Sequence, residues 1–291
     1  MKTSKAIYLF LVPGMLLYLI FFIYPTLSGL YYSFTDWDGL SPEYGFVGVD
    51  NYINMITNDL VFTRSLGNNL KFMFTVVICQ TMLSLLLAVL LVKNSKGSVF
   101  LRALYFFPAI IASISVAFIW SFMYDPTMGL INRALSAVGL DSLAMNWIGN
   151  MDIAIYSIAF VQVWAHTGQM MVVFIAGLQA IPEDLYEVAR IEGAGRWQTF
   201  RKITWPLIAP SATIVVAYTT IQSFKAFDLI FAMTGGGPAY STEILSTFLY
   251  HTAFQNYKFG YASAGSVIFM FIIALITLLQ FRILRGSKVS Y

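Results

Sequence analysis

The sequence predicts an all-α, polytopic membrane protein with six transmembrane helices. Of its 291 residues, 58% are hydrophobic and only 11% are charged, whereas about a quarter of the residues of a soluble domain are charged. Its apolar runs also reach the ~20 residues that a helix needs to cross a bilayer. They do not alternate with polar residues as the strands of a membrane barrel do. These observations exclude a soluble enzyme as the leading class.

Six segments have the length and apolar character of a transmembrane span. In chain order they cover residues 6–30, 70–92, 101–124, 153–181, 208–233 and 262–281. The first follows Lys2 and Lys5, as the apolar part of a signal peptide would. It is too long for that role and no small-residue cleavage site follows it, so we expect a retained span. The fourth exceeds the length of a perpendicular span, which predicts that it tilts or protrudes.

Lysine and arginine residues predict which ends of these spans face the cytoplasm. With a cytoplasmic N-terminus, twelve of the 17 Lys and Arg residues lie on the cytoplasmic side, and most acidic residues lie on the other. Both termini are therefore expected in the cytoplasm. The outer loops are polar and short, with an amphipathic helix expected near residues 132–138 and a helix-terminating Gly-Gly-Gly-Pro at 235–238.

One cytoplasmic segment, between the fourth and fifth spans, is polar and of mixed charge. Pro182 and the acidic residues after it favour a helix start, and Gly193 should end that helix. A second short helix is expected over 196–203. Glu183, Asp184, Glu187 and Glu192 disfavour contact with the negatively charged inner leaflet. The pattern favours docking into a protein groove, although a solvated surface helix remains open.

The spacing in this segment resembles a known family signature. Glu187-Val188-Ala189, three residues, Gly193, nine residues and Ile203-x-x-Pro206 resemble the EAA loop of the permease subunits of ABC importers. Val188 and Trp205 depart mildly from the alanine and leucine of that pattern. Residues 33–37, 46–52 and 233–238 resemble the sugar-importer branch, and within it the F-like subunit of maltose-type systems.

This resemblance implies a type I ABC importer permease fold and a set of partners. They are a second, homologous permease subunit, two copies of a cytoplasmic ATP-binding subunit, an extracytoplasmic sugar-binding protein and the sugar itself, in the lipid membrane of a bacterium. Because Gly-x4-Gly-Lys-Ser/Thr is absent from this sequence, ATP and Mg would be bound by the partner ATPase. No cofactor, nucleic acid or catalytic residue is expected in this chain.

The resemblance also assigns regions and coupling residues. The regions are a first transmembrane helix with its outer loop (1–66), a core permease domain (67–282) that contains the coupling loop (182–203), and a short cytoplasmic tail (283–291). The residues expected to transmit ATPase closure are Glu187, Val188, Ala189, Gly193, Ala194, Ile203 and Pro206.

Two polar stripes predict a substrate path, because polar groups inside a span usually face the interior of a bundle. Each stripe recurs at helical spacing, and both lie ~20 Å from the cytoplasmic ends of their spans. Uncharged amide, hydroxyl and imidazole groups suit a neutral polyhydroxyl ligand, although hydrogen bonding between helices remains the alternative. The stripes are Gln162, His166 and Gln169 in the fourth span and Thr219, Gln222 and Ser223 in the fifth.

Lys225 and Asp228 are three residues apart and are expected to form an ion pair at the outer edge of the membrane, rather than an outer gate. A metal site at His166 is not expected, because that span holds no second ligand. The sequence thus predicts the non-catalytic permease subunit of an ATP-driven sugar importer, and an oligosaccharide is the expected substrate. Alternatives are a permease for another polyhydroxyl solute such as glycerol-3-phosphate, an ion-coupled secondary transporter, which would place charges in mid-span, and a membrane enzyme using His166.

Overall fold

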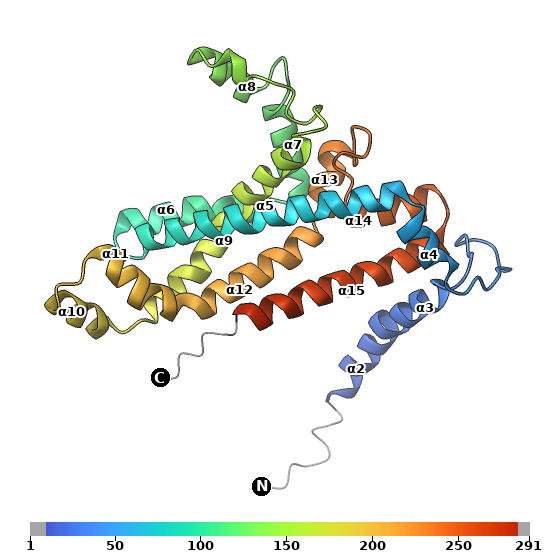
Figure 1. Ribbon diagram of the computed structural model, residues 1–291, viewed down its shortest axis with the longest axis horizontal. Coiled ribbons are helices and arrows are strands. Elements are labelled where there is room, and N and C mark those ends of the chain that lie inside the picture. Colours follow the sequence, from blue (N-terminus) through green and yellow to red (C-terminus); the bar gives the residue numbers. More distant parts are fainter. Residues whose placement is uncertain (1–9, 285–291) are drawn as a thin grey trace, which may run out of the picture. The chain divides into compact units, whose positions relative to one another are not determined.

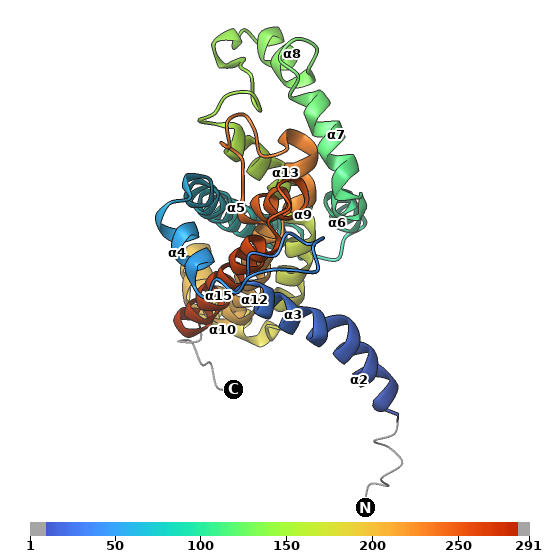
Figure 2. The same cartoon turned by 90° about the vertical axis from the view of Figure 1, so that its right-hand side faces the viewer.

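The computed structural model describes residues 10–284, which are helical apart from loops and one isolated β-bridge between Thr35 and Phe46. Residues 6–9 of the first predicted span and most of the predicted tail lie outside this range. Figures 1 and 2 show the helices. By length and composition, five helices qualify as membrane spans, and a bent pair of helices makes a sixth if it is counted as one span.

The chain divides into two compact units, residues 1–63 with 248–272, and residues 64–247 with 273–291. The first boundary lies close to the predicted one at residue 66, but a C-terminal segment joins the N-terminal unit, which the linear division does not foresee. The described helices of the first unit are α2 (Val12–Tyr18), η1 (Leu19–Ile23), α3 (Tyr24–Tyr32), α4 (Asp50–Thr57), η5 (His251–Gln255) and the start of α15 (Phe259–Leu284).

The first unit holds its loop against its helices through a small polar cluster. The Asn51 side chain donates from Nδ2 to the carbonyl oxygens of Ser33 (3.0 Å) and Thr35 (2.8 Å). The Tyr52 hydroxyl donates to Ser33 Oγ at 2.6 Å. Ser33 and Thr35 are buried, so the side chains of α4 satisfy backbone groups that would otherwise be costly to bury.

The second unit carries the remaining helices, of which α9 is the most buried candidate span. Two apolar clusters form its core: one joins α5, α7, α9 and α13, and the other joins α5, α9 and α12. The helices are α5 (Leu60–Leu91), α6 (Lys96–Phe106), η2 (Phe107–Ile110), α7 (Ser113–Met123), α8 (Leu130–Ala137), η3 (Asp141–Leu143), α9 (Ala154–Gln179), α10 (Glu183–Ile191), α11 (Arg196–Thr199), η4 (Phe200–Thr204), α12 (Trp205–Phe224) and α13 (Phe227–Thr234), with α14 (Leu245–Tyr250) at the boundary between units.

The third predicted span is not one straight helix. The helical stretch Lys96–Ile110 and α7 are bent by 99°, because Pro108 lies in the 3-10 turn η2 and Ile111 after that turn is extended. Just before the bend in the sequence, α6 makes a close contact with α9. A Cβ on Gly168 of α9 would overlap the carbonyl group of Tyr105 in α6, so only glycine allows the two backbones to approach this closely.

The fifth predicted span also ends earlier than expected. α12 stops at Phe224, and α13 begins after the non-helical Lys225 and Ala226. At its other end, α12 continues without a break from α11 and η4, so Arg196–Phe224 forms a single 29-residue helix. The second short helix expected over 196–203 is therefore the first part of the fifth span. The predicted amphipathic helix near 132–138 is confirmed as α8.

Candidate functional site

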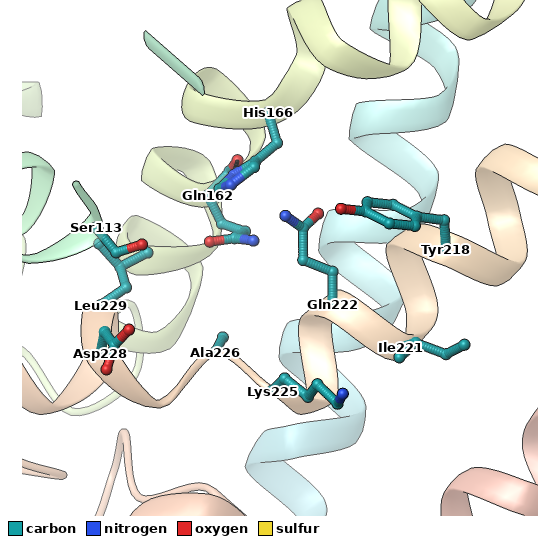
Figure 3. Close-up of a pocket in the computed structure, with 10 residues that line it drawn as sticks. All are labelled: Ser113, Gln162, His166, Tyr218, Ile221, Gln222, Lys225, Ala226, Asp228 and Leu229. Atoms are coloured by element: carbon teal, nitrogen blue, oxygen red, sulfur yellow. Dashed lines mark hydrogen bonds between the residues drawn. The ribbon is translucent and has the colours of Figure 1, made fainter. Parts of the chain in front are cut away.

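A cavity of about 250 Å³ lies where α9, α12 and α13 meet within the second unit. Figure 3 shows its lining side chains. They are mostly polar and come from both predicted stripes and from the break between α12 and α13. The lining residues are Ser113, Gln162, His166, Tyr218, Ile221, Gln222, Lys225, Ala226, Asp228 and Leu229.

The α9 side of the cavity presents Gln162 and His166, which lie one helical turn apart. His166 Nδ1 lies 3.2 Å from the carbonyl oxygen of Gln162. Because a carbonyl oxygen only accepts hydrogen bonds, Nδ1 is the donor, which fixes this side of the imidazole ring. The other ring nitrogen, Nε2, is then the one available to a ligand.

The α12 side presents Gln222, whose amide points toward that of Gln162 (Figure 3). Gln222 Oε1 is buried and has no hydrogen-bond partner in the structure. An unsatisfied buried polar atom costs about 1–3 kcal/mol. This acceptor would be satisfied by a hydroxyl group placed in the cavity, which is the group that a polyhydroxyl ligand carries in abundance.

Three of the predicted substrate-path residues do not line this cavity. Gln169 lies two turns from Gln162 and donates from Nε2 to the Tyr218 hydroxyl at 3.4 Å. Thr219 and Ser223 are completely buried, and Ser223 Oγ donates to the Thr219 carbonyl oxygen at 2.7 Å. Both side chains are buried away from the cavity, but neither forms the hydrogen bond between helices that the alternative supposes, because the Ser223 bond lies within α12 and Thr219 Oγ1 has no partner.

The cavity face of α12 is instead formed by residues 218, 221, 222 and 225. This set follows the i, i+3, i+4, i+7 spacing of one helical face, rotated by about 100° from the face that carries Thr219 and Ser223. Tyr218 was missed by sequence reasoning, although this spacing could have identified it. Ser113 could not have been found, because its position depends on the bend before α7.

Lys225 and Asp228 do not form the predicted ion pair. Both side chains are exposed and line the cavity, and Figure 3 shows them pointing away from each other. The i, i+3 rule applies within one helix. Here Lys225 follows the last residue of α12 and Asp228 lies in the first turn of α13, so the break separates their side chains.

The second candidate site is the coupling segment, defined here as residues 182–206. Its helix α10 carries Glu183 and Asp184 in the first turn and Arg190 in the last, an arrangement that complements the helix dipole. Gly193 has φ +74°, and the N–H of Ala194 donates to the Ala189 carbonyl oxygen at 2.9 Å. The left-handed conformation at Gly193 ends the helix, which explains why this position needs glycine.

The motif residues of this segment divide between two environments. Ala189 is buried and packs inward, whereas Glu187 and Val188 are exposed. Ala194, Ile203 and Pro206 are half-buried. The Tyr186 hydroxyl lies 3.2 Å from Thr204 Oγ1, which ties α10 to the start of the fifth span. The segment therefore keeps one face packed and offers another to a partner.

Metal binding has no support within residues 10–284, where His, Cys, Asp and Glu do not gather in groups of three or more. The polar groups of the cavity are instead amides, hydroxyls and an imidazole, together with the ammonium group of Lys225 and the carboxylate of Asp228.

Comparison with known proteins identifies the family. Residues 80–288 match the family described as "Binding-protein-dependent transport system inner membrane component". The chain belongs to this family. It is thus a permease, a multi-pass membrane subunit of an ABC transport system, and its long apolar helices are the candidate spans of that subunit.

Similar proteins cover nearly the whole permease. The probable ABC transporter permease protein YurN of Bacillus subtilis is 36% identical over 97% of this chain and 96% of its own length. The multiple sugar-binding transport system permease protein MsmF of Streptococcus mutans is 33% identical over 96% of this chain and 95% of its own. A crystal structure of a bacterial ABC transporter that imports the acidic polysaccharide alginate has a TM-score of 0.85 at 23% identity, covering 99% of this chain and 97% of the other. That likeness confirms the fold.

Proposed function

We propose that this permease carries a neutral sugar, of oligosaccharide class, through the cavity between α9, α12 and α13. The observation that carries the proposal is the pair of amides, Gln162 and Gln222, that face each other across the cavity, with Gln222 Oε1 lacking a partner. His166 and the Tyr218 hydroxyl add further hydrogen-bonding groups. The sugar-transport name of the similar permease MsmF supports the same substrate class.

The other solutes fit the cavity less well. A phosphate dianion, as in glycerol-3-phosphate, is best bound by several cationic donors, and here Lys225 is accompanied by the carboxylate of Asp228. An ion-coupled transporter would place ionisable groups in mid-span. α9 and α12 contain no Asp, Glu, Lys or Arg, which disfavours that mechanism.

The energy would come from partner subunits. In this proposal the outward face of α10 docks on a cytoplasmic ATP-binding subunit, present in two copies, which binds ATP and Mg. A second, homologous permease completes the pathway, and an extracytoplasmic binding protein delivers the sugar. Both termini are then cytoplasmic, as the distribution of Lys and Arg predicts.

Coupling follows from the continuity of the helices. α11, η4 and α12 form one continuous helix from the coupling segment to the cavity. A displacement of α10 that moves the start of this helix would therefore also move Gln222 near its other end. Closure of the ATPase dimer would move α10 and switch the cavity from the cytoplasmic to the outer side. Such alternating access needs only a different sugar affinity in the two states.

The test is sugar uptake by the complete importer in proteoliposomes. Truncation of either amide, Gln162→Ala or Gln222→Ala, is expected to weaken uptake by about tenfold to a hundredfold, because each loses a hydrogen bond to the sugar. Gln179→Ala is the matched control, since Gln179 is exposed at the cytoplasmic end of α9. Equal uptake by all three variants and the parent would contradict the proposed path.

A further inference from the structure

A second, larger cavity of about 580 Å³ lies behind the coupling helix α10, within the second unit. Its walls come from the end of α5, the end of α9, and the coupling segment. One part is apolar and another carries charged side chains. The lining residues are Val89, Val92, Leu178, Glu183, Tyr186, Arg190, Ala194, Arg196, Thr199, Phe200 and Thr204.

Two arginines dominate the charged part of this cavity. Within the described residues, neither Arg190 nor Arg196 has a hydrogen-bond or ion-pair partner for its guanidinium group. Arg102, on a neighbouring element, differs because its guanidinium donates to the carbonyl oxygens of Leu91 and Lys93. Arg102 is thus occupied by the protein itself, whereas Arg190 and Arg196 keep their donors for a ligand. Of the four acidic residues that disfavour contact of the whole segment with an anionic leaflet, only Glu183 lines the cavity, while Asp184, Glu187 and Glu192 do not. The cavity itself is therefore net positive.

The apolar part of the cavity is continuous with helix surface that would face lipid. Val89, which lines the cavity, is 41% exposed on α5. Phe200 also lines it and stacks on Trp197, with ring centroids 5.8 Å apart, and Trp197 is 72% exposed. Exposed tryptophan at the end of a span is typical of headgroup depth in a bilayer. Cationic donors and apolar walls therefore meet at the level of lipid headgroups.

We propose that this cavity binds an anionic phospholipid. Arg190 and Arg196 receive the phosphodiester of the headgroup in charge-assisted hydrogen bonds, and the first part of an acyl chain lies along Val89, Val92 and Phe200. Tyr186 and Thr204, already in mutual contact, border the same space. The bound lipid supports α10 from behind, between the coupling helix and the spans.

The two faces of α10 separate this site from the surface expected to bind the ATPase. Glu183, Tyr186 and Arg190 are spaced by three and four residues and face the cavity. Leu185, Val188 and Ile191 do not line it and are exposed to 40%, 52% and 85%. A lipid and an ATPase can therefore contact the helix at the same time, and lipid binding does not depend on the proposed substrate.

The binding test uses the complete importer, purified and stripped of lipid in detergent, with native mass spectrometry as the readout. When the two lipids are added back in equal amounts, the parent complex is expected to bind phosphatidylglycerol in preference to phosphatidylcholine. The variant Arg190→Gln/Arg196→Gln should lose this preference by about tenfold or more. Arg201→Gln is the matched control, since Arg201 is exposed in the same segment and does not line the cavity.

Further arms make the result decisive. The charge-preserving Arg190→Lys/Arg196→Lys is expected to keep most of the lipid preference, which shows that the loss in the glutamine variant is due to charge and not to misfolding. Millimolar inorganic phosphate should displace the lipid only weakly, because it lacks the acyl contacts. The proposal is overturned if Arg201→Gln loses as much lipid as the double variant, or if phosphate alone competes fully.

Sugar uptake in liposomes of defined composition links the site to coupling. With phosphatidylglycerol present, the parent should transport more sugar per ATP hydrolysed than in pure phosphatidylcholine, and the glutamine variant should show no such difference. An intact importer with equal lipid dependence in parent and variant would overturn the lipid site while leaving the proposed sugar transport standing. If the parent importer takes up no sugar although phosphatidylglycerol is still bound to it, that result would instead contradict the transport proposal.

Discussion

The coupling segment and the glycine-rich loop, defined here as residues 235–247, both join helices of the second unit, yet they are built in opposite ways. The second half of the glycine-rich loop is buried: Thr242, Glu243, Ile244 and Leu245 are each at most 1% exposed. The coupling segment exposes apolar side chains, up to 85% at Ile191. One segment is held by contacts within the chain, and the other exposes apolar side chains that are proposed to meet a partner.

The internal contacts explain the difference. Asn68 of α5 donates from Nδ2 to the carbonyl oxygens of Tyr240 (2.9 Å) and Glu243 (3.0 Å), and the Leu245 N–H donates to Asn69 Oδ1 at 3.2 Å. Asparagine side chains on one helix thus satisfy the backbone of a loop far along the chain. Backbone that is buried this way specifies a fixed loop, whereas exposed apolar surface marks an interaction site.

The largest expected effect is on the exposed segment. Glu187→Arg reverses a charge on the surface proposed to meet the ATPase, so sugar uptake should fall by at least about a hundredfold while the permease still folds. Uptake and thermal unfolding of the purified importer measure the two effects. Glu43→Arg, an equally exposed charge reversal in the first unit, should leave uptake unchanged. A similar loss of uptake in Glu43→Arg would show that the effect of Glu187→Arg is not specific to the coupling segment.

Glycine-to-alanine substitutions compare the two segments by the loss of unfolding free energy that each substitution causes. Gly236 has φ +91° and a Cβ there would overlap the Glu243 carboxylate, so Gly236→Ala should destabilise the permease by about 2–5 kcal/mol. Gly193 has φ +74° with nothing within 4 Å of the added Cβ, and Gly193→Ala should cost only about 1–2 kcal/mol. Chemical denaturation of the purified protein measures both.

Gly97→Ala provides the baseline of this series. Gly97 lies in α6 with an ordinary φ and open space around its Cβ position, so alanine should be neutral or stabilise by up to about 1 kcal/mol. A ranking in which Gly193→Ala is the most harmful would show that the coupling segment, and not the buried loop, is the more rigidly specified part.

Hydrogen-bond deletions sharpen the comparison at a smaller scale. Asn68→Ala removes two bonds and leaves buried carbonyl oxygens unpaired, which should cost about 2–4 kcal/mol. Tyr186→Phe removes the single contact with Thr204 in the coupling segment and should cost about 1 kcal/mol or less. Unfolding midpoints of the two variants, measured side by side, give the difference. Equal costs would mean that the coupling segment is held from within as firmly as the loop.

The smallest effect concerns an exposed turn that resembles neither segment. Backbone N–H groups of Met128 and Thr127 and the Thr127 hydroxyl donate to Asp125, and these bonds lower the pKa of its carboxyl below 3.8. The ionised carboxylate therefore stabilises the fold above that value, and its contribution is lost as the pH falls through the lowered pKa.

Asp125→Asn is accordingly expected to lower the unfolding temperature slightly at pH 7 and by less at pH 3. Thermal unfolding of parent and variant at both values measures the difference. A deficit that is larger at pH 3 would have the wrong sign for this carboxylate and would assign the effect to another group.

Sequence pattern alone predicts those features that depend on local spacing. Gly193 ends α10, α8 lies where amphipathic periodicity predicts it, and Gln162 and His166 share a face because they are four residues apart. The cavity residues Tyr218 and Ser113 and the orientations of Lys225 and Asp228 escaped prediction. Ser113 depends on the bend before α7, and the orientations of Lys225 and Asp228 depend on the break after α12. Tyr218 is different, because its helical spacing with Gln222 could have identified it.

Composition and charge by themselves determined that this chain is a helical membrane protein, and the spacing of its cytoplasmic motif determined its family, because hydrophobic length and residue order are properties of the linear chain. Only the tertiary structure decided which face of α12 meets α9, and that the third and fifth spans break. It also decided that one face of α10 closes a cavity while the other stays exposed. The physical reason is that burial and cavity formation depend on contacts between residues distant in sequence, such as Gly168 against Tyr105, whose geometry no local pattern encodes.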